Sequence, residues 1–146
     1  MEQSRKNLKL SSIVVLILSA FYAIQLVCEL MFGEINNATI PEGAPDNILL
    51  ITKIVLASIA GLLLIPNIYI GVKGLKVAKN PDSSKAHIVW AIILLVFSCL
   101  ALISPIVDFI NNGIQYKITS AFCSIVVDIT VFIEYIYYAR AVAKGA

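Results

Sequence analysis

The apolar residues of this chain fall into four long blocks separated by short polar segments. The blocks run from Leu10 to Phe32, Ile48 to Val72, Ile88 to Ile110 and Ile118 to Ala139. Each block is close to the roughly 20 residues that an α-helix needs to cross the hydrocarbon core of a bilayer. The pattern predicts an all-α, polytopic transmembrane four-helix bundle. We expect a single transmembrane domain over residues 1–146, with helices at approximately residues 10–32, 48–72, 87–110 and 116–140.

Composition agrees with this prediction and excludes other classes of protein. Hydrophobic residues make up 60% of the chain and charged residues 14%, which is typical of membrane proteins and not of soluble domains. The net charge of +2 does not favour a nucleic-acid partner. Arg5, Lys6 and Lys9 precede an apolar run, as in a signal peptide, but the run continues to Phe32 and is longer than a typical signal core. We therefore expect the first helix to be retained.

The polar connections predict how the helices are oriented. The segment from Gly33 to Asn47 is acidic and contains no Lys or Arg, whereas nine of the 11 Lys and Arg residues lie in the N-terminal segment, the connection from Lys73 to Lys85 and the C-terminal tail. By the positive-inside rule, both termini are cytoplasmic (N-in/C-in) in the cell (plasma) membrane. Two outward hairpins would then be joined by a basic cytoplasmic loop. A tight turn is expected at Gly113, where glycine tolerates a positive φ.

Asp128 is the most informative polar residue within the predicted spans. It lies eleven residues after Lys117, or roughly 16 Å along a helix, and so close to the bilayer midplane. Ionisable residues at this depth are costly and are either paired anchors or parts of a functional pathway. Two interpretations stay open. A protonated Asp128 donates a hydrogen bond to Ser98, Tyr22 or a backbone carbonyl for packing, or Asp128 binds and releases a proton during transport.

Four further ionisable residues lie near the predicted outer boundary: Glu29, Lys53, Asp108 and Lys117. Two acids and two lysines at one level could neutralise one another, which predicts an outer ion-pair cluster that fixes helix packing. The alternative is a vestibule that admits an ion or a polar ligand. Residues three and four apart share a helix face, so we expect these side chains and the Asp128 group to face the bundle centre.

Two prolines and three cysteines interrupt the apolar blocks. Pro66 and Pro105 each lack an N–H group, so we expect packing kinks in the second and third helices. Cys28, Cys99 and Cys123 form no CxxC pair and have no metal-ligand spacing with a histidine. We interpret them as small apolar packing residues.

The segment from Gly71 to Lys85 carries a family resemblance. It reads Gly-Val-Lys-Gly-Leu-Lys-Val-Ala-Lys-Asn-Pro-Asp-Ser-Ser-Lys and precedes a long apolar helix. It resembles the basic cytoplasmic hairpin of small, uncharacterised four-helix bacterial membrane proteins. The resemblance implies the topology and a bacterial source, and it implies no activity. We also expect Asp82 or Ser83 to cap the third helix.

The sequence shows no nucleophile, metal-ligand or cofactor motif, so we expect no enzymatic activity, no cofactor and no metal. The favoured function is that of a non-enzymatic interaction or accessory protein, or an immunity-type protein, in contact with the lipid bilayer and with a membrane-protein partner or further copies of itself. The alternative is a subunit of an oligomeric proton- or cation-coupled small-molecule transporter or channel using Asp128. Small multidrug transporters carry a glutamate in the middle of the first helix, whereas Glu29 lies near its end.

Overall fold

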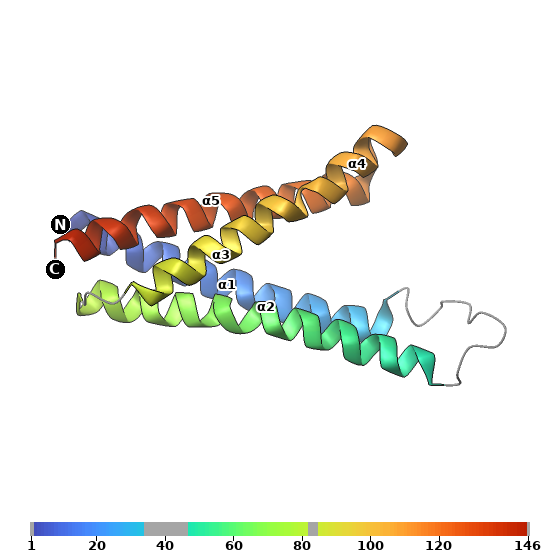
Figure 1. Ribbon diagram of the computed structural model, residues 1–146, viewed down its shortest axis with the longest axis horizontal. Coiled ribbons are helices and arrows are strands. Elements are labelled where there is room, and N and C mark those ends of the chain that lie inside the picture. Colours follow the sequence, from blue (N-terminus) through green and yellow to red (C-terminus); the bar gives the residue numbers. More distant parts are fainter. Residues whose placement is uncertain (1, 34–46, 82–84, 146) are drawn as a thin grey trace.

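The computed structural model describes residues 2–33, 47–81 and 85–145 (Figure 1). The acidic connection expected before Asn47 falls mostly outside these residues, as do Asp82 and Ser83, the two expected caps. The helices are α1 (Glu2–Phe32), α2 (Ile48–Lys79), α3 (Ala86–Ala101), α4 (Ile103–Asn112) and α5 (Tyr116–Lys144). Because α3 and α4 together form one span, the described residues contain four helical spans long and apolar enough to cross a membrane.

The helices extend beyond the apolar blocks at the end of the molecule that holds both termini. The segment after Lys73, expected to be a loop, is helical as far as Lys79. Apolar and small residues continue there at helical spacing, with Gly74, Val77 and Ala78 buried, and lysine is a good helix former. Hydropathy marks where a chain crosses a bilayer, and the helix itself continues as long as one face has a neighbour to pack against.

The third predicted helix is interrupted at Leu102, which separates α3 from α4. Pro105 lies three residues later. It has no N–H to donate to the carbonyl of Ala101, and its ring crowds that carbonyl. Helical hydrogen bonding resumes with the N–H of Ile106, which donates to the carbonyl of Leu102 at 3.2 Å. Pro66, in contrast, lies within α2 without ending it.

The helices form a ring in which each span packs against its neighbours in sequence. Helix α1 contacts α2 and α5, and α3 contacts α2 and α5. The start of α1, the end of α2, the start of α3 and the end of α5 lie at one end of the bundle, and the α1–α2 pair diverges from the α4–α5 pair toward the other end (Figure 1). The chain reverses direction after α4 at Gly113, which has a φ of +70° and confirms the expected glycine turn.

The packed core lies near the termini. Tyr135 is fully buried, and its hydroxyl donates to the carbonyl of Ile70 at 3.0 Å. The ring of His87 lies edge-on to that of Tyr135, with 6.1 Å between centroids. A Cβ on Gly74 would collide with the hydroxyls of Ser12 and Tyr135, so glycine allows α1, α2 and α5 to approach closely here.

The outer surface is strongly apolar. Large side chains such as Leu62 and Ile110 are 70% and 74% exposed, as expected where lipid replaces water. Cys28, Cys99 and Cys123 are also exposed, so the expectation that they pack within the bundle is wrong. A thiol behaves as a small apolar group, and it gains little from packing inside a bundle when the outside is equally apolar.

A polar cavity between the four spans as the candidate functional site

A cavity of about 760 Å³ lies between the diverging halves of the bundle and is lined by all four spans. Its size is within the range of small-molecule binding sites, roughly 300–1,000 Å³. The lining is divided by helix. Helices α1 and α5 contribute most of the polar side chains, which are Tyr22, Gln25, Glu29, Lys117, Ser120, Ser124 and Asp128. Helices α2 and α3 contribute mainly Leu, Ala and Phe, with Asn67 and Ser98 as the polar exceptions.

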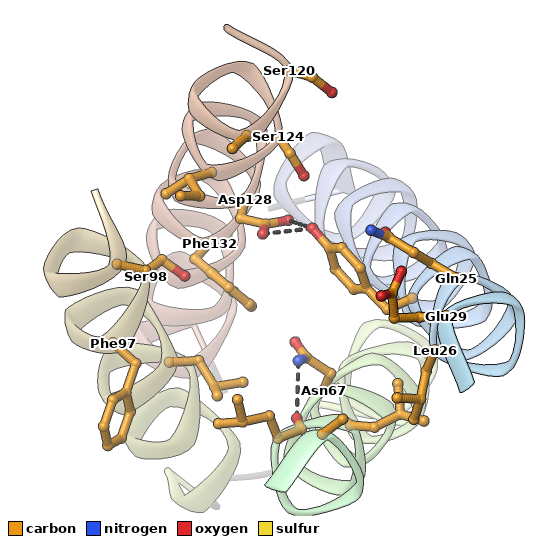
Figure 2. A pocket seen from close by; sticks show the side chains of 18 of the residues that line it. Gln25, Leu26, Glu29, Asn67, Phe97, Ser98, Ser120, Ser124, Asp128 and Phe132 are labelled. Atoms are coloured by element: carbon orange, nitrogen blue, oxygen red, sulfur yellow. Dashed lines mark hydrogen bonds between the residues drawn. The ribbon is translucent and has the colours of Figure 1, made fainter. Parts of the chain in front are cut away.

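A hydrogen-bonded pair lies at the floor of the cavity. The hydroxyl of Tyr22, on α1, donates to Asp128, on α5, with distances of 2.6 Å to Oδ1 and 2.5 Å to Oδ2 (Figure 2). Of the partners expected for Asp128, the structure therefore uses Tyr22, and Ser98 lines the same cavity from α3. A hydroxyl has one proton, whereas a carboxylate can accept about four hydrogen bonds. Asp128 thus keeps acceptor capacity toward the cavity.

Asn67 faces the same region from α2. Its side-chain nitrogen donates to the carbonyl of Leu63 at 3.0 Å, and because only the nitrogen can donate, the amide oxygen is directed into the cavity (Figure 2). Two oxygen acceptors, from Asp128 and Asn67, therefore converge at the floor. Asn67 was not among the predicted site residues. The signal was present, since it shares a helical stripe with Ala60 and Leu64, which also line the cavity.

The cavity ends at this layer. Tyr22, Asn67 and Asp128 also line a void of about 10 Å³ beneath it, which is close to the space one water molecule needs. Farther toward the termini the side chains are tightly packed, with Tyr135 and Val142 only 0% and 1% exposed. The bundle is therefore open at the end where the hairpins diverge and closed at the end that holds the termini.

Two of the four residues of the expected ion-pair cluster line the cavity. Glu29, near the end of α1, and Lys117, in the first turn of α5, both line the cavity. Lys53 and Asp108 do not line it: Lys53 is half-buried on α2 and Asp108 is exposed on α4. The cluster stays a prediction, and the cavity geometry brings only one acid and one base of the four to a common space.

No protein-family model, curated protein sequence or solved structure matches this chain.

Proposed function

We propose that the protein resides in the cell membrane with both termini cytoplasmic, so that the cavity opens to the outside. The distribution of charge supports this orientation. The cationic residues of the N-terminal segment, the end of α2 and the C-terminal tail gather at one end of the bundle, which by the positive-inside rule is the cytoplasmic end.

Within that frame, we propose that the protein is a subunit of a proton- or cation-coupled small-molecule transporter in which Asp128 binds the coupled ion or the substrate. The observation that carries this proposal is the cavity, which crosses half of the bundle and ends on Asp128. A purely structural carboxyl group needs a partner but no cavity beside it. The Tyr22–Asp128 bond also joins the two hairpins, so an occupant of Asp128 that displaces Tyr22 changes how the hairpins contact each other.

Flux in reconstituted vesicles tests this function. With an imposed proton gradient, the parent protein should take up substrates from a panel of small organic cations and amino compounds, and Asp128→Asn should abolish the gradient-driven part. Glu134→Gln is the matched control, because Glu134 is an exposed acid on the same helix and does not line the cavity. Absence of gradient-driven flux in the parent protein across the panel would rule out the proposed transport.

The accessory or immunity-type function is the second candidate, and the cationic end of the bundle favours it. Lys76 and Lys79 are exposed at the end of α2, beside both termini, where an acidic partner domain could bind. This function predicts a stable membrane-protein partner after extraction in mild detergent, lost on charge reversal with Lys76→Glu and Lys79→Glu. Repeated purification of this chain alone would count against it.

A further inference from the structure

The two walls of the cavity differ in polarity, and this difference limits what can occupy it. One side of any occupant faces Gln25, Ser120 and Ser124 on α1 and α5, and the other faces Leu63, Leu64 and Phe97 on α2 and α3. A uniformly polar molecule would leave the apolar wall in contact with polar groups. A uniformly apolar molecule would leave the hydroxyls and the carboxyl group without partners. The cavity therefore fits an amphipathic ligand.

The floor determines the charge of the polar end. Asp128 and Asn67 both present oxygen acceptors there, and the hydroxyls of Ser98 and Ser124 can accept as well. An anion would meet a carboxyl group and an amide oxygen at this point. The basic residue that lines the cavity, Lys117, lies roughly 16 Å up the same helix, and the acid Glu29 lines the cavity closer to the floor, roughly 10 Å along α1 from Tyr22. The floor therefore favours a cation with hydrogen atoms to donate.

We infer that the cavity binds amphipathic amines, with the protonated amino group between Asp128 and Asn67 and the apolar body against α2 and α3. This inference rests on the proposed ligand-binding role of the cavity and names its substrate class. An N–H donor makes charge-assisted hydrogen bonds to both oxygens, which a quaternary ammonium group cannot do. The rings of Tyr22 and Phe132 also line the cavity and attract any cation by its charge. They therefore discriminate less between a protonated amine and a quaternary ammonium group.

Binding of a matched series of octyl compounds tests the inference. The full-length protein is placed in phosphatidylcholine nanodiscs, and octylammonium, octyltrimethylammonium, octanol and octanoate are titrated by calorimetry, with empty nanodiscs as the blank. Octylammonium should bind saturably and at least about tenfold more tightly than the trimethyl compound and the alcohol, and octanoate should not bind. Equal affinities for the amine and the alcohol would overturn the inference.

Variants locate the amino group. Asp128→Asn and Asn67→Leu should each weaken octylammonium binding by about tenfold or more and bring it close to that of the alcohol. Thr130→Ala, an exposed position on α5 outside the cavity, should leave it unchanged. If Asp128→Asn does not fold, the Asn67→Leu variant and the ligand series still test where the amino group binds. Unchanged amine affinity in a folded variant of either floor residue would contradict the assignment.

Separate measurements identify the source of the amine and distinguish amine binding from transport. If phosphatidylethanolamine in the nanodisc competes with octylammonium, the natural amine is a lipid headgroup; without competition it is a free amine. Selective amine binding without gradient-driven flux would refute the transport proposal and leave this inference standing. Gradient-driven flux of other compounds, without any preference in binding for the amine, would refute this inference and leave the transport proposal standing.

Discussion

At the scale of single residues, the Tyr22–Asp128 contact is the most consequential feature of the molecule. It joins side chains 106 positions apart in the sequence and connects the two hairpins at the level where the cavity ends. Both residues are half-buried between apolar helices. Loss of either partner would remove the hydrogen bond that joins α1 to α5 at a half-buried position, and such a loss costs more than an exposed hydrogen bond is worth.

A double-mutant cycle should therefore detect this contact. Tyr22→Phe and Asp128→Ala should each destabilise the protein, and the double variant should be less destabilised than their sum, with a coupling free energy of roughly 1–3 kcal/mol. Unfolding in mixed detergent micelles measures these differences. Tyr137→Phe, at a 67% exposed tyrosine of the same helix, serves as the control and should show no coupling to Asp128→Ala. Strict additivity of the Tyr22 and Asp128 variants would show that the contact is not formed.

Part of this site could be predicted from the sequence. Helical periodicity alone places Tyr22, Gln25 and Glu29 on one face of α1, and Lys117, Ser124 and Asp128 share a face of α5, as the cavity lining shows. Periodicity failed to predict how far the hairpins diverge, because that angle depends on long-range packing at the other end of the bundle. Asp108, which was expected to face the bundle centre, is exposed on α4 and lies outside the cavity.

At the scale of elements, close approach near the termini holds the bundle together. Gly74 lies where α2 meets α1 and α5, and an added methyl group would collide with the hydroxyls of Ser12 and Tyr135. Gly61, thirteen residues earlier on the same helix, has no atom of another described segment within 4 Å of the position a Cβ would take. The two glycines therefore differ in packing while sharing a helical backbone.

Alanine substitution at these two glycines should have opposite effects. Gly74→Ala should destabilise the protein by about 1–3 kcal/mol through overpacking. Gly61→Ala should be neutral or slightly stabilising, because alanine favours a helix by roughly 0.5–1 kcal/mol over glycine. Thermal unfolding in detergent, followed by circular dichroism, measures both. Equal shifts in melting temperature for the two variants would contradict the close approach described for Gly74.

Some features of the helices could be predicted from the sequence, and others could not. The spans themselves could be predicted because each apolar block matches the thickness of a bilayer. The helical stretch between Lys73 and Lys79 could not, since its charges resemble those of a loop while Gly74, Val77 and Ala78 pack against neighbouring helices. The break at Leu102 follows from Pro105, yet Pro66 leaves α2 intact. Proline marks a weakened turn, and the surrounding packing decides whether the helix ends there.

At the scale of the whole molecule, the proposed orientation makes a prediction for each end of the bundle. In a background with the three native cysteines replaced by alanine, Asn112→Cys should react with a membrane-impermeant thiol reagent added to intact cells. Gly145→Cys should react only after the membrane is permeabilised. Both positions are exposed, and they lie at opposite ends of the bundle. The reverse pattern of labelling would invert the topology and place the mouth of the cavity in the cytoplasm.

The cavity reaches from the divergent end of the bundle to Asp128, and water should enter it from that end. The reactivity of a cysteine at position 124 tests this access most directly. Ser124 lines the cavity one turn from Asp128, whereas Thr130 is exposed on the same helix outside it. A cysteine must be hydrated and ionised to react with a small charged thiosulfonate. In the same cysteine-free background, Ser124→Cys should therefore react from the side of Asn112 and Thr130→Cys should not. An unreactive Ser124→Cys in a folded protein, or equal reactivity at both positions, would contradict the account.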